Sequence, residues 1–256
     1  MESYEEWLGA YAALAWQVEL GVEDAVLDAP INRYDIAEPA PIAKSTKPNV
    51  QTPVKELDPT DYAKAAVKDI QDINALQNAL NGFEHCDLRN GARNTVFADG
   101  IPSSRVMIIG EAPGRDEDQQ GKPFVGRAGQ LLDKMFAAIG LSRASDLSAK
   151  GIYITNVIPW RPPQNREPTP QEIAMMVPFL QRHIELVAPE FIVVMGNTPM
   201  SALLGMRGIT KHRGTWGMFD GKPVLPMVHP AYLLRNPIAK RDAWADLLSL
   251  KKRMEA

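Results

Sequence analysis

The chain has 256 residues, of which 45% are hydrophobic and 23% charged, so it can bury a full core. Its single cysteine, Cys86, excludes an intramolecular disulfide framework and any zinc or iron–sulfur site built from several thiolates of this chain. No stretch approaches the roughly 20 apolar residues of a membrane span, and the start MESYEEWLGA is acidic where a secretory signal is basic. We therefore expect a cytoplasmic protein that does not associate with membranes.

The net charge of −3 is unevenly distributed along the chain. Residues 1–75 contain 14 acidic and 6 basic side chains, whereas the remainder contains 17 acidic and 22 basic ones. The mildly basic part, residues 76–256, is compatible with a polyanionic partner. The acidic part, residues 1–75, would be repelled from such a partner. Ordinary solvated surface charge explains both parts equally well, so charge alone does not decide between the two interpretations.

Residues 1–35 are predicted to form a helical extension, because apolar side chains from Tyr4 to Val18 fall at helical spacing. One helix cannot form a core, so we expect it to dock on the body of the same chain, with a second copy or a protein partner as alternatives. Residues 36–59 are predicted to be a linker, since five prolines lie between Pro39 and Pro59. We expect a monomer.

Residues 60–256 alternate between helical and strand patterns. A first helix carries one apolar face from Val67 to Leu80, and strands are predicted at 105–110, 152–156, 191–195 and 224–228. Between them, helices are predicted at 129–139, from Thr169, at 198–204 and at 237–254; the one from Thr169 opens with a capping box and a proline in its first position. This order predicts an α/β fold with a parallel sheet flanked by helices.

In open α/β sheets, ligands bind at the carboxyl ends of the strands, so the segments just after the strands are the candidates for the site. The segment after the first strand, GEAPGRDEDQQGKPFVGRAG, spans Gly110 to Gly129. It is not a phosphate loop, because Gly114 and Gly121 are too far apart and Pro123 occupies the place of the metal-binding Ser or Thr. This argues against a nucleotide hydrolase.

Four segments, GEAPGRDEDQQGKPFVGRAG, YITN, RPPQNR and HPAYLLRNP, resemble the uracil-DNA glycosylase superfamily, and most closely its family 4, the thermostable type. The resemblance covers roughly Phe83 to the C-terminus. It implies a four-stranded parallel sheet flanked by helices, and a monofunctional DNA glycosylase that flips uracil out of DNA and hydrolyses its glycosidic bond to leave an abasic site.

The chain departs from family 4 at the cofactor. The resemblance implies four cysteines for a [4Fe–4S] cluster, and these positions fall here at Phe83, Cys86, Trp160 and either Met175 or Met176. A cluster needs thiolates, so we expect no iron–sulfur cluster and no other metal, with an apolar plug in the vacated volume. Cys86 is expected to be a small buried side chain, with a reactive thiol as the minority alternative.

Three residues are expected to recognise and activate the base. By resemblance, Phe124 stacks on uracil, Asn156 reads O4 and N3–H, and His229 donates to O2 as negative charge builds there. The alternatives are a core aromatic residue, a strand-end turn residue and a structural histidine, respectively. Gly110 and Asn165, which lie in the same motifs, are predicted to contribute to substrate binding.

Glu111 and Glu117 are the candidate carboxylates for positioning water or offsetting the cationic sugar, and either could instead cap a turn. Other branches of the superfamily place Asp or Asn at the position of Ala112, which we assign to substrate binding. Because Ala cannot act as a base, a protein that binds uracil-containing or abasic DNA with little or no turnover is the alternative function.

The expected macromolecular partner is uracil-containing DNA. Tyr232, Leu233 and Arg235 fit a loop that enters the duplex where the base leaves. Four cations are candidates for contacts to phosphate, each as readily explained as ordinary surface charge: Arg161, Arg166, Lys211 and Arg213.

Overall fold

The computed structural model describes residues 10–12, 14 and 58–256. Residues 10–12 and 14 are helical, at the place of the helix predicted near the N-terminus. The rest of the predicted extension and almost all of the predicted linker lie outside the described residues. The division into 1–35, 36–59 and 60–256 therefore stays a prediction, and the fold below is that of the compact unit Lys55–Ala256.

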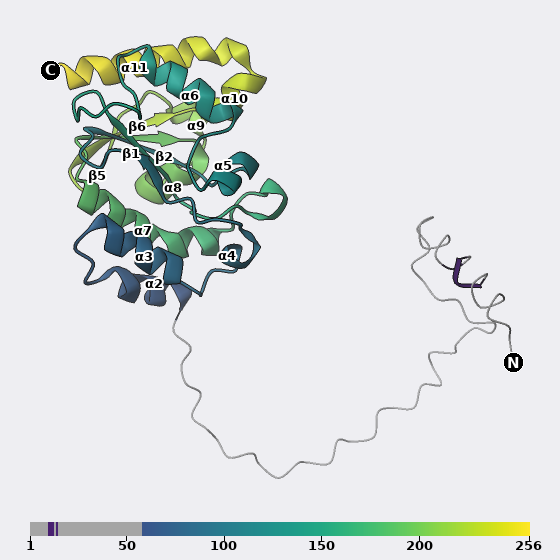
Figure 1. Cartoon of the computed structure of the whole chain (residues 1–256). Helices are drawn as coiled ribbons and strands as arrows, with labels where there is room; N and C mark the ends of the chain where they lie inside the picture. Colours follow the sequence, from purple (N-terminus) through teal and green to yellow (C-terminus); the bar gives the residue numbers. More distant parts are fainter. Residues whose placement is uncertain (1–9, 13, 15–57) are drawn as a thin grey trace, which may run out of the picture. The chain divides into compact units, whose positions relative to one another are not determined.

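A six-stranded sheet in the order β1-β3-β2-β4-β6-β5 forms the centre of this unit (Figure 1). The four predicted strands are present and parallel to one another, which confirms the α/β prediction. The expected number of four strands was too low, because β1 and β5 pair antiparallel at the two edges. Each has three residues and no apolar run, so neither leaves a strand pattern in the sequence. The strands are β1 Ala98–Gly100, β2 Val106–Gly110, β3 Ile152–Asn156, β4 Phe191–Met195, β5 Gly217–Phe219 and β6 Lys222–Met227.

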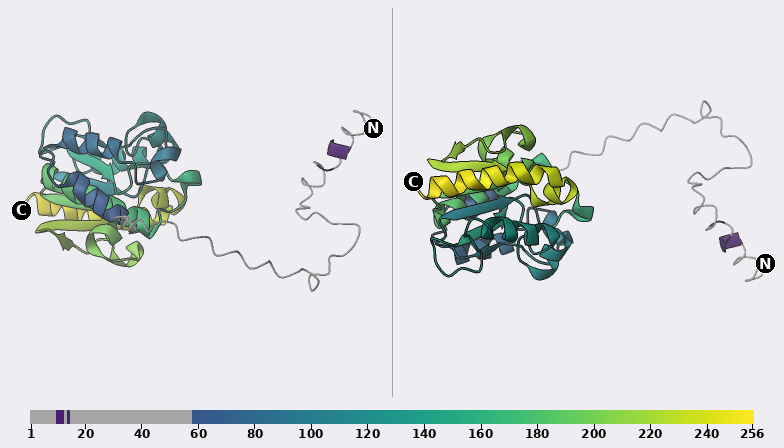
Figure 2. Two further views of the ribbon diagram at one scale, coloured as in Figure 1. Left: turned by 90° about the horizontal axis from the view of Figure 1, so that it is seen from below. Right: turned by 90° about the horizontal axis from the view of Figure 1, so that it is seen from above.

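Helices cover both faces of the sheet (Figures 1 and 2). The helices that pack on one face contribute to the larger apolar cluster: α2 Pro59–Val67, α3 Ile73–Gly82, α7 Pro170–Val187 and α8 Asn197–Leu204. Those on the other face contribute to a second cluster: α6 Arg127–Ala137, α10 Pro230–Arg235 and α11 Lys240–Met254. Short helices occupy the connections: α4 Leu88–Gly91, α5 Arg115–Gln120, α9 Ile209–His212, and the 3-10 turns η1 Pro163–Asn165 and η2 Pro237–Ala239.

The buried strands divide their side chains between the two apolar clusters. In β2, Met107 and Ile109 belong to the cluster under α7, whereas Val106 and Ile108 belong to the cluster under α6 and α11. This alternation follows from the two-residue period of a strand. It explains why every residue of β2 is buried and why the strand reads as one continuous apolar run.

The predicted start of α7 is confirmed. The hydroxyl of Thr169 accepts the backbone N–H of Glu172 at 3.2 Å, and the Glu172 carboxylate accepts the backbone N–H of Thr169 at 2.7 Å. The single helix predicted over residues 67–80 was wrong. The chain forms two helices there because Asp72 caps a new one, with its carboxylate accepting the N–H of Ala75 at 2.8 Å.

Across the described residues, no helix combines the length and apolar character needed to cross a membrane.

Candidate active site

The carboxyl ends of the four parallel strands meet at one edge of the sheet, where a hollow of about 290 Å³ opens. Gly110 ends β2, Asn156 ends β3, and His229 follows β6 by two residues. The hollow is lined by Glu111, Ala112, Pro113, Gly114, Glu117, Phe124, Ala128, Asn156, Pro162, Asn165, Arg166, His229 and Ala231. Residues from all four sequence motifs are thus brought together.

A second hollow of about 580 Å³ adjoins the first. The two share Glu111, Ala112, Asn165, His229 and Ala231 in their linings. The shared residues place the two hollows side by side at the carboxyl ends of the strands.

Gly110 allows Asn156 and Phe124 to lie close together. A Cβ atom at this position would lie 2.3 Å from Oδ1 of Asn156 and 2.6 Å from the ring of Phe124. Real carbon atoms do not approach so closely, so any side chain here would push these two groups apart. The predicted contribution of Gly110 is therefore the space that it leaves.

Phe124 holds a backbone conformation that few side chains adopt. Its φ is +53°, in the left-handed region, which costs about 1–2 kcal/mol for a residue with a Cβ. Its ring is buried and stacks on the ring of His229, with 5.4 Å between centroids and 28° between planes. Gly129 makes room for this turn, because a Cβ there would lie 1.7 Å from the Phe124 carbonyl oxygen. Strain held in this way is typical of functional sites.

Glu117 fastens the loop that carries Phe124. Its carboxylate accepts backbone N–H groups from Gly114 at 3.1 Å, Val125 at 3.0 Å and Gly126 at 2.9 Å. With three backbone donors on its two oxygens, Glu117 contributes to the shape of the loop although it borders the hollow. Asp118, next to it, accepts the N–H groups of Arg93 and Asn94.

His229 is oriented as a neutral hydrogen-bond donor. Its Nδ1 accepts the backbone N–H of Ala231 at 3.1 Å, so the ring proton resides on Nε2. Burial lowers the pKa of His229 to about 4, an effect to which nearby Arg235 adds and which Glu117 opposes. At neutral pH the imidazole is therefore uncharged and has one N–H to donate.

Glu111 is held by Thr198, whose hydroxyl donates to Oε2 at 2.6 Å. Both residues line the 580 Å³ hollow, and Glu111 also lines the smaller one. The hydrogen bond fixes one carboxylate oxygen and leaves Oε1 without a hydrogen bond from any described residue. Ala112, beside it, offers no polar group.

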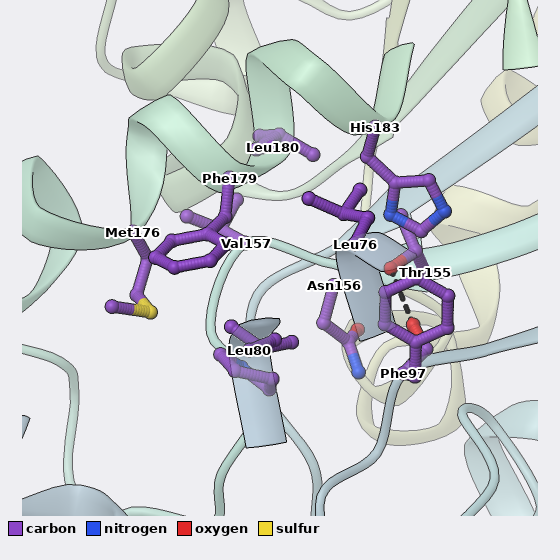
Figure 3. Close-up of a pocket in the computed structure, with 11 residues that line it drawn as sticks. Leu76, Leu80, Phe97, Thr155, Asn156, Val157, Met176, Phe179, Leu180 and His183 are labelled. Atoms are coloured by element: carbon purple, nitrogen blue, oxygen red, sulfur yellow. Dashed lines mark hydrogen bonds between the residues drawn. The ribbon is translucent and has the colours of Figure 1, made fainter. Parts of the chain in front are cut away.

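Asn156 is buried, with only 7% of the residue exposed, and yet its carboxamide makes no hydrogen bond to another described residue. Behind it lies a cavity of about 20 Å³, lined on other sides by Leu76, Leu80 and His183 (Figure 3). This volume suits one water molecule and is too small for a base. A base that Asn156 reads therefore has to occupy the 290 Å³ hollow.

His183 is a second buried histidine, 4% exposed. Burial lowers the pKa of its imidazole to about 3, and its Nε2 lies 2.9 Å from the hydroxyl of Tyr153. The ring also stacks on Phe97, with 4.6 Å between centroids. These contacts pack the His183 ring against Tyr153 of β3 and against Phe97.

The two basic residues of the RPPQNR motif already have partners. Arg161 donates from Nε to Oδ1 of Asn165 at 2.8 Å, and Asn165 lines both hollows. Arg166 donates to both carboxylate oxygens of Glu172, at 2.9 and 2.6 Å, and so lowers the pKa of that carboxyl. The motif is thereby tied to the first turn of α7.

Arg213 lies outside the linings of the two hollows. It pairs with Asp246 and donates from Nη2 to the backbone carbonyl of Asp242 at 2.8 Å. Lys211, two residues earlier, is exposed and has no ion pair among the described residues. The structure therefore does not bring Arg213 to the rest of the predicted site.

Tyr232 and Arg235 line the larger hollow. Leu233 does not: it is 1% exposed and belongs to the core, which contradicts its predicted entry into a duplex. The HPAYLLRNP segment is helical, so neighbouring side chains point in different directions. Leu234, 37% exposed, is the apolar side chain that this helix presents outward.

The positions of the four expected cluster ligands do not fit an iron–sulfur cluster. Phe83, Cys86, Trp160 and Met176 are all buried in the larger apolar cluster, and the indole of Trp160 donates to the hydroxyl of Thr95 at 3.1 Å. Only one of these side chains is a thiol, and burial raises the pKa of Cys86. Within the described residues, no group of three or more His, Cys, Asp or Glu is arranged to hold a metal ion.

Thr198 is a residue that the sequence analysis missed. It was read as the start of α8, and the signal that would have identified it is its place just beyond the carboxyl end of β4, where parallel-sheet sites form. The sequence also did not single out Arg143, because the loop between α6 and β3 in which it lies carries no motif.

The comparisons with known proteins agree with this geometry. A family model described as the uracil DNA glycosylase superfamily matches residues 97–248. The Type-4 uracil-DNA glycosylase of Thermotoga maritima is 42% identical over 156 residues, which cover 59% of this chain and 77% of the relative. The Type-4 enzyme of Saccharolobus solfataricus is 34% identical over 197 residues, covering 73% and 88%. The Type-4 enzyme of Archaeoglobus fulgidus is 36% identical over 188 residues, covering 69% and 90%.

These matches confirm the resemblance inferred from the four motifs. The family model includes the strand ends that carry Gly110, Asn156 and His229. With relatives above 30% identity covered over most of their length, the chain belongs to the uracil-DNA glycosylase superfamily.

Proposed function

We propose that this chain is a monofunctional uracil-DNA glycosylase that takes uracil out of the base stack, hydrolyses its N-glycosidic bond and leaves an abasic site. The observation that carries the proposal is the convergence of an unengaged Asn156 carboxamide, the Phe124 ring and a neutral His229 on one 290 Å³ hollow. A base inside a duplex cannot reach a hollow behind the strand ends, so it has to be flipped first.

Base recognition falls to Asn156 and Phe124. The amide of Asn156 donates to uracil O4 and accepts from N3–H, a pattern that cytosine inverts at both atoms. Phe124 supplies an apolar face, and stacking on a base is worth about 1–3 kcal/mol. Gly110 leaves no side chain between these two groups, which supports their acting on the same ring.

His229 stabilises the leaving group. Cleavage of the bond from deoxyribose C1′ to uracil N1 puts negative charge on the base, and Nε2–H donates to O2 as that charge grows. A preorganised donor of this kind is typically worth about 2.7–4 kcal/mol. The lowered pKa of His229, about 4, keeps the ring neutral. The imidazole therefore stabilises the leaving base by donating a hydrogen bond and carries no positive charge of its own.

Glu111 orients the water that attacks C1′. Its Oε2 is fixed by Thr198, and Oε1 accepts from the water. The water oxygen bonds to C1′, the C1′–N1 pair of electrons leaves with the uracil anion, and the water's proton passes through Glu111 to solvent, from which the anion is reprotonated. Glu117 acts on the loop geometry through its three backbone contacts.

DNA lies along the two hollows. Tyr232, Arg235 and Asn165 border the larger one, and Arg161 reaches it through Asn165. Leu234 replaces Leu233 as the apolar side chain that enters the duplex, since it is the exposed one of the pair.

The enzyme works without an iron–sulfur cluster, because apolar side chains occupy three of the four ligand positions. We expect the purified full-length chain to be colourless and to contain no stoichiometric iron. A visible absorbance band with stoichiometric iron per chain would contradict this.

The test of the function is single-turnover incubation of the full chain with an end-labelled oligonucleotide that contains one uracil, followed by heating in alkali to cleave abasic sites. The parent should give full cleavage at the uracil, and His229→Gln should slow it about 100-fold or more. His85→Gln, a histidine that stacks on Tyr62 away from the hollows, is the matched control and should retain the parent rate.

A protein that binds uracil-containing or abasic DNA without turnover is the competing function, which Ala112 favours because it leaves no carboxylate at that position. It would retard the oligonucleotide in a gel and leave it resistant to alkali, and that result would overturn the glycosylase proposal.

A further inference from the structure

Phe124 is held from behind by Arg143, in the loop between α6 and β3. Arg143 donates from Nη1 to the carbonyl of Pro123 at 2.8 Å and from Nη2 to the carbonyl of Phe124 at 2.9 Å. These two carbonyls lie on either side of the Phe124 Cα, the atom about which the backbone takes its left-handed turn. One guanidinium group therefore donates hydrogen bonds to the peptide groups on both sides of Phe124.

The guanidinium group is itself fixed. Its Nε donates to Asp133 at 2.8 Å and its Nη1 to Asp99 at 3.1 Å, and the side chain is only 13% exposed. A planar fork with its orientation set by two carboxylates loses little freedom when it binds two carbonyls. The two carboxylates fix the orientation of the guanidinium group, and the guanidinium group in turn fixes the position of the Pro123 and Phe124 carbonyls.

A purely structural role would be the simplest explanation of such an ion-pair network. Three observations on the same loop point further: Phe124 has a φ of +53°, its ring stacks on His229, and a Cβ at Gly129 would collide with its carbonyl. A strained conformation persists only where its surroundings over-determine it. At Phe124, those surroundings are the two donors of Arg143, the space at Gly129 and the Glu117 carboxylate that binds the next two amides.

We propose that Arg143 is a positioning residue: it holds Phe124 in the conformation that stacks on the flipped base, and it sets the affinity for that base without touching it. This inference rests on the proposed function, because the stacking ring matters only if a base enters the hollow.

The first test measures the loop directly. Arg143→Met removes the fork and keeps most of the side-chain length, and Arg143→Lys keeps the charge without the two-pronged geometry. The matched control is Arg105→Met, since Arg105 also binds a carboxylate, Glu190, and a backbone carbonyl, that of Met254. Circular dichroism and thermal melting establish that each variant is folded.

Hydrogen exchange in peptides that span residues 121–129 reports the loosening of the loop. The amides of Val125 and Gly126, which donate to Glu117, should exchange on the order of tenfold faster in Arg143→Met, less so in Arg143→Lys, and at the parent rate in Arg105→Met. Unchanged exchange in both Arg143 variants would overturn the proposal, whatever the activity of the protein.

The second test separates affinity from chemistry. In single-turnover excision, Arg143→Met should raise the half-saturating enzyme concentration about tenfold and change the maximal rate less than about threefold, because stacking acts on ground state and transition state alike. Arg143→Lys should recover part of the loss. An equal rise of the half-saturating concentration in Arg105→Met would show that destabilisation alone explains the effect and would overturn the proposal.

A double-mutant cycle with Phe124→Ala completes the argument. If Arg143 acts through Phe124, Arg143→Met should change half-saturation by less than about twofold once the ring is gone. Full additivity would assign Arg143 an independent role and overturn the proposal. A parent chain that fails to excise uracil would instead count against the proposed function, while the exchange experiment still decides the Arg143 contacts.

Discussion

The carboxamide of Asn156 is the group in the hollow that we propose distinguishes one base from another. It is buried at the end of a parallel strand, and no described residue occupies its hydrogen-bonding atoms. A carboxamide carries both a donor and an acceptor, whereas a carboxylate only accepts unless it is protonated. Replacing Asn156 by Asp exchanges the NH₂ donor for an oxygen acceptor. The side-chain volume hardly changes, but one of the two hydrogen-bonding atoms presented to a base reverses its role.

Asn156→Asp should weaken uracil excision about tenfold to a hundredfold, since two acceptors left facing each other cost about 1–3 kcal/mol. The same change gains compatibility with the N4 amino group of cytosine, so cytosine excision should rise relative to uracil excision. Asn156→Ala should impair uracil excision without this gain. Both are measured as single-turnover rates on oligonucleotides that differ only in the target base.

Asn90→Asp provides the control for the added charge, because Asn90 is exposed on α4, outside the linings of both hollows. It should excise uracil at the parent rate. Parent rates in both Asn156 variants, with cytosine untouched, would show that Asn156 is a strand-end turn residue.

The two buried histidines make stability depend on pH. His229 and His183 have pKa values lowered by burial to about 4 and about 3, whereas an unfolded histidine titrates near 6.5. Below about pH 6.5 the unfolded chain takes up protons that the folded chain excludes. The free energy of unfolding should therefore fall as the pH drops from about 6.5 towards 4, by about 1.4 kcal/mol per pH unit for each histidine.

Urea denaturation of the parent and of His229→Gln between pH 7 and 5 measures this slope. The variant should lose about half of the histidine contribution. An identical slope in the two proteins would mean that folding does not lower the pKa of His229, and so would remove the argument that burial keeps this ring neutral.

The residues of the hollow were predictable to the extent that their motifs sit at strand ends. Asn156, Phe124 and His229 meet as expected, because parallel strands end at one edge of the sheet. Leu233 was misplaced because HPAYLLRNP was read as a loop, and helix α10 turns that side chain into the core. Arg143 was unpredictable, since its partners lie 10 to 44 residues away and are joined only by folding.

At the scale of elements, local signals account for most of what was predicted correctly. The sequence pattern predicts the apolar strands β2, β3, β4 and β6 and the capped helix α7. It does not predict the three-residue edge strands or the short helix α5. The break between α2 and α3 depends on the cap at Asp72, which an apolar pattern running through both helices conceals.

The cap of α7 gives a test of this reading. Thr169→Ala removes the acceptor for the Glu172 N–H and should lower the free energy of unfolding by about 1 kcal/mol, the usual cost of losing an N-cap. Thr210→Ala, at an exposed threonine in α9, is the matched control and should be nearly neutral. Urea denaturation of the two variants gives the comparison, and equal stability would mean that the Arg166–Glu172 pair alone holds the start of the helix.

At the scale of the whole molecule, the sheet, both apolar clusters and both hollows belong to the unit Lys55–Ala256. The family match likewise lies within residues 97–248. The sequence places most of the acidic excess upstream and the basic excess downstream. The part that carries the site is thus also the part whose charge suits a polyanion.

A chain truncated to begin at Asp58 should fold and excise uracil at a rate within about threefold of the parent. A threefold change corresponds to about 0.7 kcal/mol in the activation free energy, and a much larger loss would require residues 1–57 to contact the site. Asp58 is a suitable start, since its carboxylate caps α2 by accepting the N–H of Thr60 at 2.8 Å. Melting temperature and single-turnover rate are measured on both proteins. Loss of folding and activity together would show that residues 1–57 complete the core, whereas loss of activity in a folded chain would assign them to DNA binding.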